Sequence, residues 1–153
     1  MKRLKTLGKY LVLFLKAFNV LSIIFLLLLY FIVKKVGIHF DWFIMMIYPC
    51  GICFIYIVHE FILMFETFKE NEPFNSDNIE RLKKSMKVCF IISLLVVIAL
   101  LINIFLYSYY SLQLRVALAF IAILFFGVGV ALYIISVLFK QAVKYKEEND
   151  LTI

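Results

Sequence analysis

Four long stretches without a charged residue occupy most of the chain. They are Ala17–Val33, Trp42–Val58, Val88–Leu114 and Val116–Phe139. A helix that rises about 1.5 Å per residue needs roughly 20 apolar residues to cross the bilayer core. The last two stretches exceed that length, and the first two reach it when flanking residues are added. The sequence therefore predicts four transmembrane helices.

The composition supports this interpretation. Hydrophobic residues make up 65% of the 153 residues, and the mean hydropathy is +1.04. A soluble chain of this size could not cover so much apolar surface. The stretches do not alternate strictly between apolar and polar residues, which argues against a transmembrane β-barrel. We expect an all-α, integral membrane four-helix bundle that forms a single transmembrane domain.

The basic residues are distributed unevenly between the two ends of the predicted spans. Thirteen of the sixteen lie before the first span or just inside its entry, between the second and third, or after the fourth. Three lie on the opposite side: Lys34, Lys35 and Arg115. Cytoplasmic loops carry an excess of Lys and Arg, so the asymmetry predicts that both termini are cytoplasmic. The net charge of +6 then reports topology and contact with anionic lipid, and it is weak evidence for nucleic-acid binding.

This topology gives approximate boundaries. The spans are expected at about 10–33, 42–65, 88–107 and 116–139, with a cytoplasmic loop at 66–87 and a cytoplasmic tail at 140–153. The basic N-terminus resembles the start of a signal peptide, but the apolar stretch is too long and lacks a small-residue cleavage site. We expect an uncleaved first span.

The central loop contains signals for a helix start. Pro73 disfavours helical geometry in the residue before it. Asp77 and Glu80 have the spacing of a capping box, with Asn75 and Ser76 as alternative N-caps. We expect one helix that begins near Asp77 and enters the membrane without a break.

An apolar face follows on that helix. Ile79, Leu82 and Met86 share it at three- and four-residue spacing. Packing against a neighbouring helix end is the structural interpretation, and a docking surface for a soluble partner is the functional one.

A C-x-x-C motif lies inside the second span. Cys50 and Cys53 could cycle between dithiol and disulfide, which would make the protein a membrane thiol oxidoreductase. However, no second cysteine pair exists to relay electrons, and Cys89 is expected at the opposite membrane face. Ordinary buried thiols are the favoured interpretation. Pro49 and Gly51 then indicate a kink or a close-packing site.

Glu60 is the only acidic residue predicted inside a span, and an intramembrane ionisable residue is a functional candidate by default. Its depth is close to the inner interface, where Lys16 and Lys140 are within reach. The structural interpretation is an ion pair of Glu60 with Lys16 or Lys140. The functional alternative is a proton or cation relay with His59, as in a small transporter or immunity protein.

Further polar and small residues in the spans have structural interpretations. Asn19 and Asn103 are expected to hydrogen-bond between helices. Gly127 and Ala131 form a small-xxx-small pair, which predicts close helix packing within the bundle or in a homodimer. We find no metal-binding or cofactor-binding motif and no nucleophile–base pair, so we expect no cofactor, no metal and no enzymatic activity.

Two stretches resemble a bacterial protein family. PFNSDNIERLKK at 73–84 resembles the loop signature of the domain-of-unknown-function family numbered 2975, and FKQAVKYKEENDLTI at 139–153 is similar to that family's acidic ending. The resemblance implies a small four-span protein of the bacterial cytoplasmic membrane, without an established activity. In that family, the gene for a member commonly lies beside the gene for a small helix-turn-helix transcription regulator.

The leading hypothesis follows from that resemblance. It is a non-enzymatic membrane protein whose loop and tail bind or sequester such a regulator, without contacting nucleic acid directly. The candidate partner-binding residues are Pro73, Phe74, Asn75, Asn78, Arg81, Leu82, Glu147, Glu148, Asn149 and Asp150.

Overall fold

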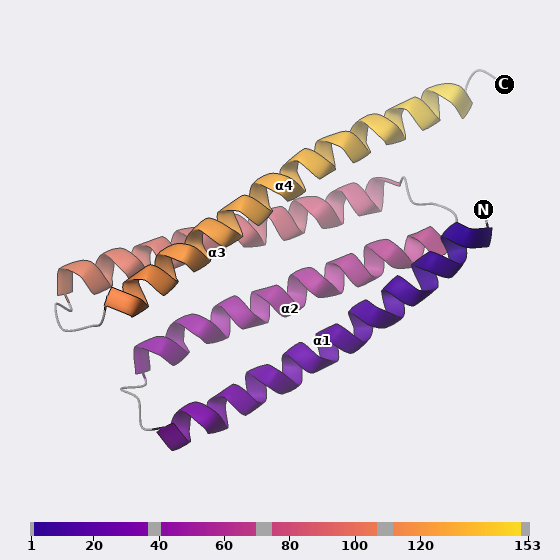
Figure 1. Ribbon diagram of the computed structural model, residues 1–153. Helices are drawn as coiled ribbons and strands as arrows, with labels where there is room; N and C mark the ends of the chain where they lie inside the picture. Colours follow the sequence, from indigo (N-terminus) through magenta and orange to yellow (C-terminus); the bar gives the residue numbers. More distant parts are fainter. Residues whose placement is uncertain (1, 37–40, 70–74, 107–111, 151–153) are drawn as a thin grey trace.

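The chain forms four long helices that run antiparallel to their neighbours in sequence. The computed structural model describes residues 2–36, 41–69, 75–106 and 112–150 (Figure 1). The helices are α1 (Lys2–Val36), α2 (Asp41–Lys69), α3 (Ser76–Leu106) and α4 (Leu112–Asp150). The start of α1, the end of α2, the start of α3 and the end of α4 all lie at one end of the bundle, which we call the terminal end.

The predicted fold class is confirmed for the described residues. Each of the four helices is long enough and apolar enough to cross a membrane, so the chain is a multi-pass membrane protein. A helix satisfies every internal backbone group, as lipid requires. The helices also extend further than the apolar stretches: α2 continues to Lys69, α3 begins at Ser76, and α4 runs through most of the predicted tail.

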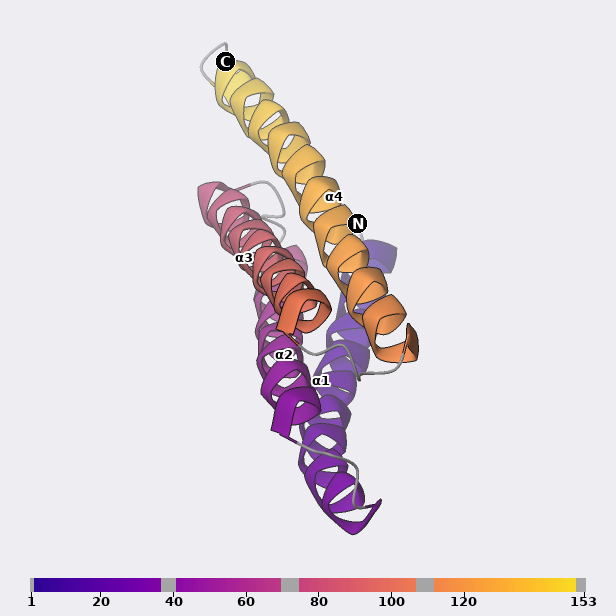
Figure 2. The same ribbon diagram turned by 90° about the vertical axis from the view of Figure 1, so that its left-hand side faces the viewer.

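Each helix packs mainly on its neighbour in the chain, as Figures 1 and 2 show. The contact between α3 and α4 is the most extensive, α1 packs on α2, and α2 joins the two pairs through α3. A single apolar cluster fills the space between α2, α3 and α4. Its buried members are Ile57, Met64, Leu82, Cys89, Ile92, Val96, Leu118, Ala122, Phe125 and Leu132.

Helix α1 lies at the edge of the bundle. Most of its apolar side chains are exposed, which suits a helix that faces lipid. It is held to α2 by Val12, which packs with Val58 and Ile62, and by a hydrogen bond of 3.1 Å that the Tyr48 hydroxyl donates to the backbone carbonyl of Leu26. A groove of about 700 Å³ with apolar walls separates α1 and α2 from α4.

Two glycines permit close helix contacts: Gly51, where a close-packing site was one of the two predictions, and Gly129, which was not predicted. A Cβ atom at Gly51 would collide with the Leu26 side chain, and one at Gly129 would lie 2.9 Å from Cε1 of Phe90. Gly127 has no atom within 4 Å of the corresponding position, and both Gly127 and Ala131 are exposed. Within this chain Gly129 therefore makes the close contact, while a homodimer through Gly127 and Ala131 stays a prediction.

Candidate functional site

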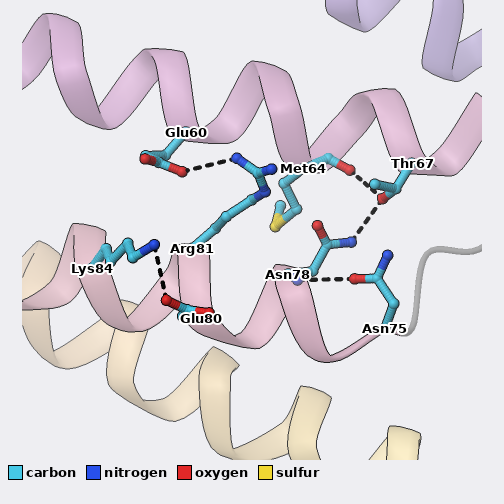
Figure 3. Close-up of polar contacts among 8 residues, drawn as sticks. All are labelled: Glu60, Met64, Thr67, Asn75, Asn78, Glu80, Arg81 and Lys84. Atoms are coloured by element: carbon cyan, nitrogen blue, oxygen red, sulfur yellow. Dashed lines mark hydrogen bonds and ion pairs between the residues drawn. The ribbon is translucent and has the colours of Figure 1, made fainter.

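The most developed group of polar contacts lies between α2 and α3, towards the terminal end. Figure 3 shows two neighbouring groups here: Asn75, Asn78 and Thr67 are linked by hydrogen bonds, and Glu60 and Arg81 form an ion pair. We call these five residues the α2–α3 polar cluster. Three of them belong to the sequence motif that resembles the family signature. The cluster therefore shows what that motif does in the fold.

Asn75 and Asn78 fix the start of α3 and attach it to α2. Oδ1 of Asn75 accepts a hydrogen bond of 2.9 Å from the backbone N–H of Asn78, as an N-cap side chain does. The side-chain amide of Asn78 donates to Oγ1 of Thr67 over 2.7 Å, and that hydroxyl donates to the carbonyl of Met64 over 2.6 Å. Asn78 is completely buried, so its polar groups depend on protein partners.

Glu60 and Arg81 form the charged half of the cluster. Nη1 of Arg81 lies 3.2 Å from Oε2 of Glu60, and the Glu60 side chain is only 12% exposed. Nε of Arg81 is buried and has no hydrogen-bond partner within the described part of the chain. Lys84 is close enough to add to the positive potential at Glu60. This pair ties α2 to α3 where the apolar stretch of α2 ends.

The predicted partners of Glu60 were wrong. Lys16 pairs instead with Glu66, with 2.6 Å between Nζ and Oε1, and Lys140 is exposed on α4. Arg81 reaches Glu60 because the helix that begins at Ser76 runs directly alongside α2. The choice among nearby cations depends on the rotation of each helix, which a nearly all-apolar stretch does not reveal.

The apolar face of the central loop packs inside the protein. Leu82 is 2% exposed and belongs to the core, while Met86 is half-buried against it. The structural interpretation of this face is confirmed. Asn78 and Leu82 are therefore engaged within the chain, and Pro73 and Phe74 lie outside the described residues.

The tail residues are placed differently. Glu147, Glu148 and Asn149 lie on the last turns of α4 and are exposed, and α4 ends at Asp150. Glu148 lies 3.6 Å from Lys144, one turn earlier on the same helix. Of the predicted partner-binding residues whose side chains the structure describes, Glu147, Glu148 and Asn149 are the exposed ones.

The cysteines are free thiols packed against the core. Cys50 and Cys53 are half-buried on α2, and Cys89 is fully buried on α3. The expected separation of Cys89 from Cys53 was wrong, because the register that joins Glu60 to Arg81 sets Cys53 level with Cys89. Among the described residues, no three His, Cys, Asp or Glu side chains gather into a possible metal site.

Sequence reasoning missed several polar residues that connect helices. Ser93 donates a hydrogen bond of 2.9 Å to the Ala122 carbonyl, and Thr67 joins Asn78 to α2. Isolated hydroxyls in apolar helices were the available signal, since such groups need an acceptor in lipid. The prediction for Asn103 is confirmed, because it accepts a hydrogen bond of 3.2 Å from Nε of Arg115. No interhelical hydrogen bond of the Asn19 side chain is found among the described residues.

The fold defines a four-helix, multi-pass membrane protein in which the α2–α3 polar cluster connects two of the helices. The family model described as "Protein of unknown function (DUF2975)" matches residues 2–153, so the chain belongs to this family and the suspected resemblance is confirmed. The comparison with curated proteins gave no match, and no solved structure matches the chain.

Proposed function

We propose that this protein is a non-enzymatic membrane anchor that holds a small soluble regulator at the cytoplasmic membrane through the end of α4. The observation that supports this is the acidic end of a projecting helix. Glu147, Glu148 and Asp150 occupy its last turn, where no basic residue is present, although Lys144 and Lys146 precede it. The helix macrodipole disfavours anions at a C-terminus by about 0.3–1 kcal/mol each. A basic partner would offset that cost.

The end of α4 is also accessible. Contacts of Ser93 with Ala122 and of Phe90 with Gly129 set the α3–α4 register, which brings the first residue of α3 opposite residues close to Lys140. The helix from Lys144 onward therefore has no α3 backbone beside it. Seven residues at 1.5 Å each make a projection of about 10 Å.

The chemistry suits a DNA-binding partner. Helix-turn-helix regulators carry basic DNA-facing surfaces, because phosphate contacts dominate their affinity. An acidic helix end that covers such a surface would compete with DNA without itself binding nucleic acid. The α2–α3 polar cluster would then serve as scaffold, since its motif residues are engaged within the fold.

Membranes from the native cell test this proposal. We expect a soluble helix-turn-helix protein to co-purify with the wild-type chain, and its DNA binding to fall when these membranes are added. Glu147→Lys combined with Glu148→Lys should release it, as should high salt. Glu80→Lys is the control, because Glu80 is another exposed acid near the terminal end. The proposal would be excluded if no helix-turn-helix protein co-purified with the wild-type chain, or if the charge-reversed tail retained it equally well.

A further inference from the structure

A small groove between α1 and α2 is lined by both polar and apolar side chains. It encloses about 350 Å³ and is lined by Lys16, Asn19, Val20, Ile23, His59, Ile62, Leu63 and Glu66. On each helix the lining residues follow i, i+3, i+4 and i+7 spacing, so one stripe of α1 faces one stripe of α2. This face of the pair is opposite to the one that lines the large apolar groove.

The groove lies at the boundary between apolar and polar chain. Lys16 immediately precedes the apolar stretch of α1, and His59 immediately follows that of α2. Val20 and Ile23 are exposed on the apolar side of the same stripe. A phospholipid has this order of chemistry, with a polar headgroup above an acyl chain, and long cationic side chains reach the same level by snorkelling.

The charges of the groove match a zwitterion. Lys16 and Glu66 contribute one positive and one negative charge 2.6 Å apart, and both side chains remain partly exposed. A headgroup with a phosphate and an ammonium can place each charge beside its opposite. An anionic headgroup would bring no positive charge to Glu66, while His59 adds a ring nitrogen that can donate to phosphate.

Asn19 adds specificity for an N–H donor. Its Oδ1 is buried and has no hydrogen-bond partner within the described part of the chain. Rotation of the amide about its terminal bond therefore loses no hydrogen bond and turns the oxygen towards the groove. A primary ammonium has three N–H donors, whereas a quaternary choline ammonium has none.

We propose that this groove binds one zwitterionic phospholipid with a primary amine in its headgroup, of the phosphatidylethanolamine type. The Lys16 ammonium and the His59 ring face the phosphate, Asn19 and Glu66 face the ammonium, and Val20, Ile23 and Leu63 contact the first part of an acyl chain. The volume lies at the lower end of the range typical of ligand pockets, about 300–1,000 Å³. The site is independent of the α4 tail.

Native mass spectrometry of the purified full chain tests this proposal with phosphatidylethanolamine, phosphatidylcholine and phosphatidylglycerol of identical acyl chains. We expect phosphatidylethanolamine to be retained about two- to tenfold more than the other two, the range for one hydrogen bond exchanged against water. Asn19→Leu should abolish its advantage over phosphatidylcholine. Ser22→Ala should leave it unchanged, because Ser22 lines the opposite groove and donates its hydrogen bond to the Phe18 carbonyl of its own helix.

Two further measurements distinguish binding of the whole lipid from binding of its headgroup alone and provide a second variant. Soluble glycerophosphoethanolamine should not displace the lipid, since it has no acyl chain to bury. Lys16→Gln should lower retention of all three lipids, which gives a second variant if Asn19→Leu does not fold. Equal retention of the three lipids, preference for phosphatidylglycerol, displacement by the soluble headgroup, or an unchanged preference in Asn19→Leu would each overturn the proposal.

Discussion

Glu60 and Arg81 show how much one polar contact contributes between apolar helices. The carboxylate is nearly buried, and the guanidinium already has one buried nitrogen without a partner among the described residues. Removal of the Glu60 charge leaves the partly buried guanidinium of Arg81 without its counterion. We expect Glu60→Gln to lower the free energy of unfolding by about 1–3 kcal/mol, the cost of leaving a buried group unsatisfied.

A denaturation titration in mixed micelles measures this effect, with loss of helicity as the signal. Glu80→Gln is the control, because its exposed i,i+4 pair with Lys84 is of a kind that contributes little. If both variants unfold at the same denaturant concentration as the wild type, the ion pair does not hold α2 to α3.

At the scale of an element, the start of α3 depends on Asn75. Its side chain caps a helix that would otherwise begin with unpaired N–H groups beside a proline-containing connection. We expect Asn75→Ala to destabilise the fold by about 1 kcal/mol and to increase amide hydrogen exchange at the first turn of α3. Ser76→Ala, at the exposed first residue of α3, should leave exchange at that turn nearly unchanged. Equal exchange in the two variants would argue against the cap.

The α3–α4 contact makes a second prediction at this scale. Alanine at Gly129 would press on the Phe90 ring, which packs on Phe126 with 5.6 Å between ring centroids. Overpacking of this kind costs about 1–3 kcal/mol. Gly127→Ala meets open space in the chain and gains helix propensity. We expect Gly129→Ala to lower the thermal unfolding temperature and Gly127→Ala to maintain or raise it; the reverse order would contradict the packing described here.

For the whole molecule, the sequence predicts the fold class well and the site only in part. Uncharged stretches of bilayer length specify four helices because lipid leaves the backbone few alternatives. It is harder to predict which residues meet between two helices. Adjacent residues project about 100° apart, and a helix that is apolar all round does not indicate which face meets its neighbour. Hence the helical start near Asp77 and the packing of Leu82 were predicted, whereas the Glu60–Arg81 pair and the contact of Gly129 were not.

The direction of insertion is the last whole-molecule property that the sequence predicts. The described helices place the start of α1 and the end of α4 at one end of the bundle, and thirteen of the sixteen basic residues belong to that side of the chain. We expect a reporter fused after Ile153 to be active only on the cytoplasmic side, and a thiol introduced at the exposed Leu112 to react with impermeant reagents from outside. Cytoplasmic labelling at Leu112 would show the opposite orientation. In that case the acidic end of α4 could not reach a cytoplasmic regulator, whereas the zwitterionic lipid site would be unaffected.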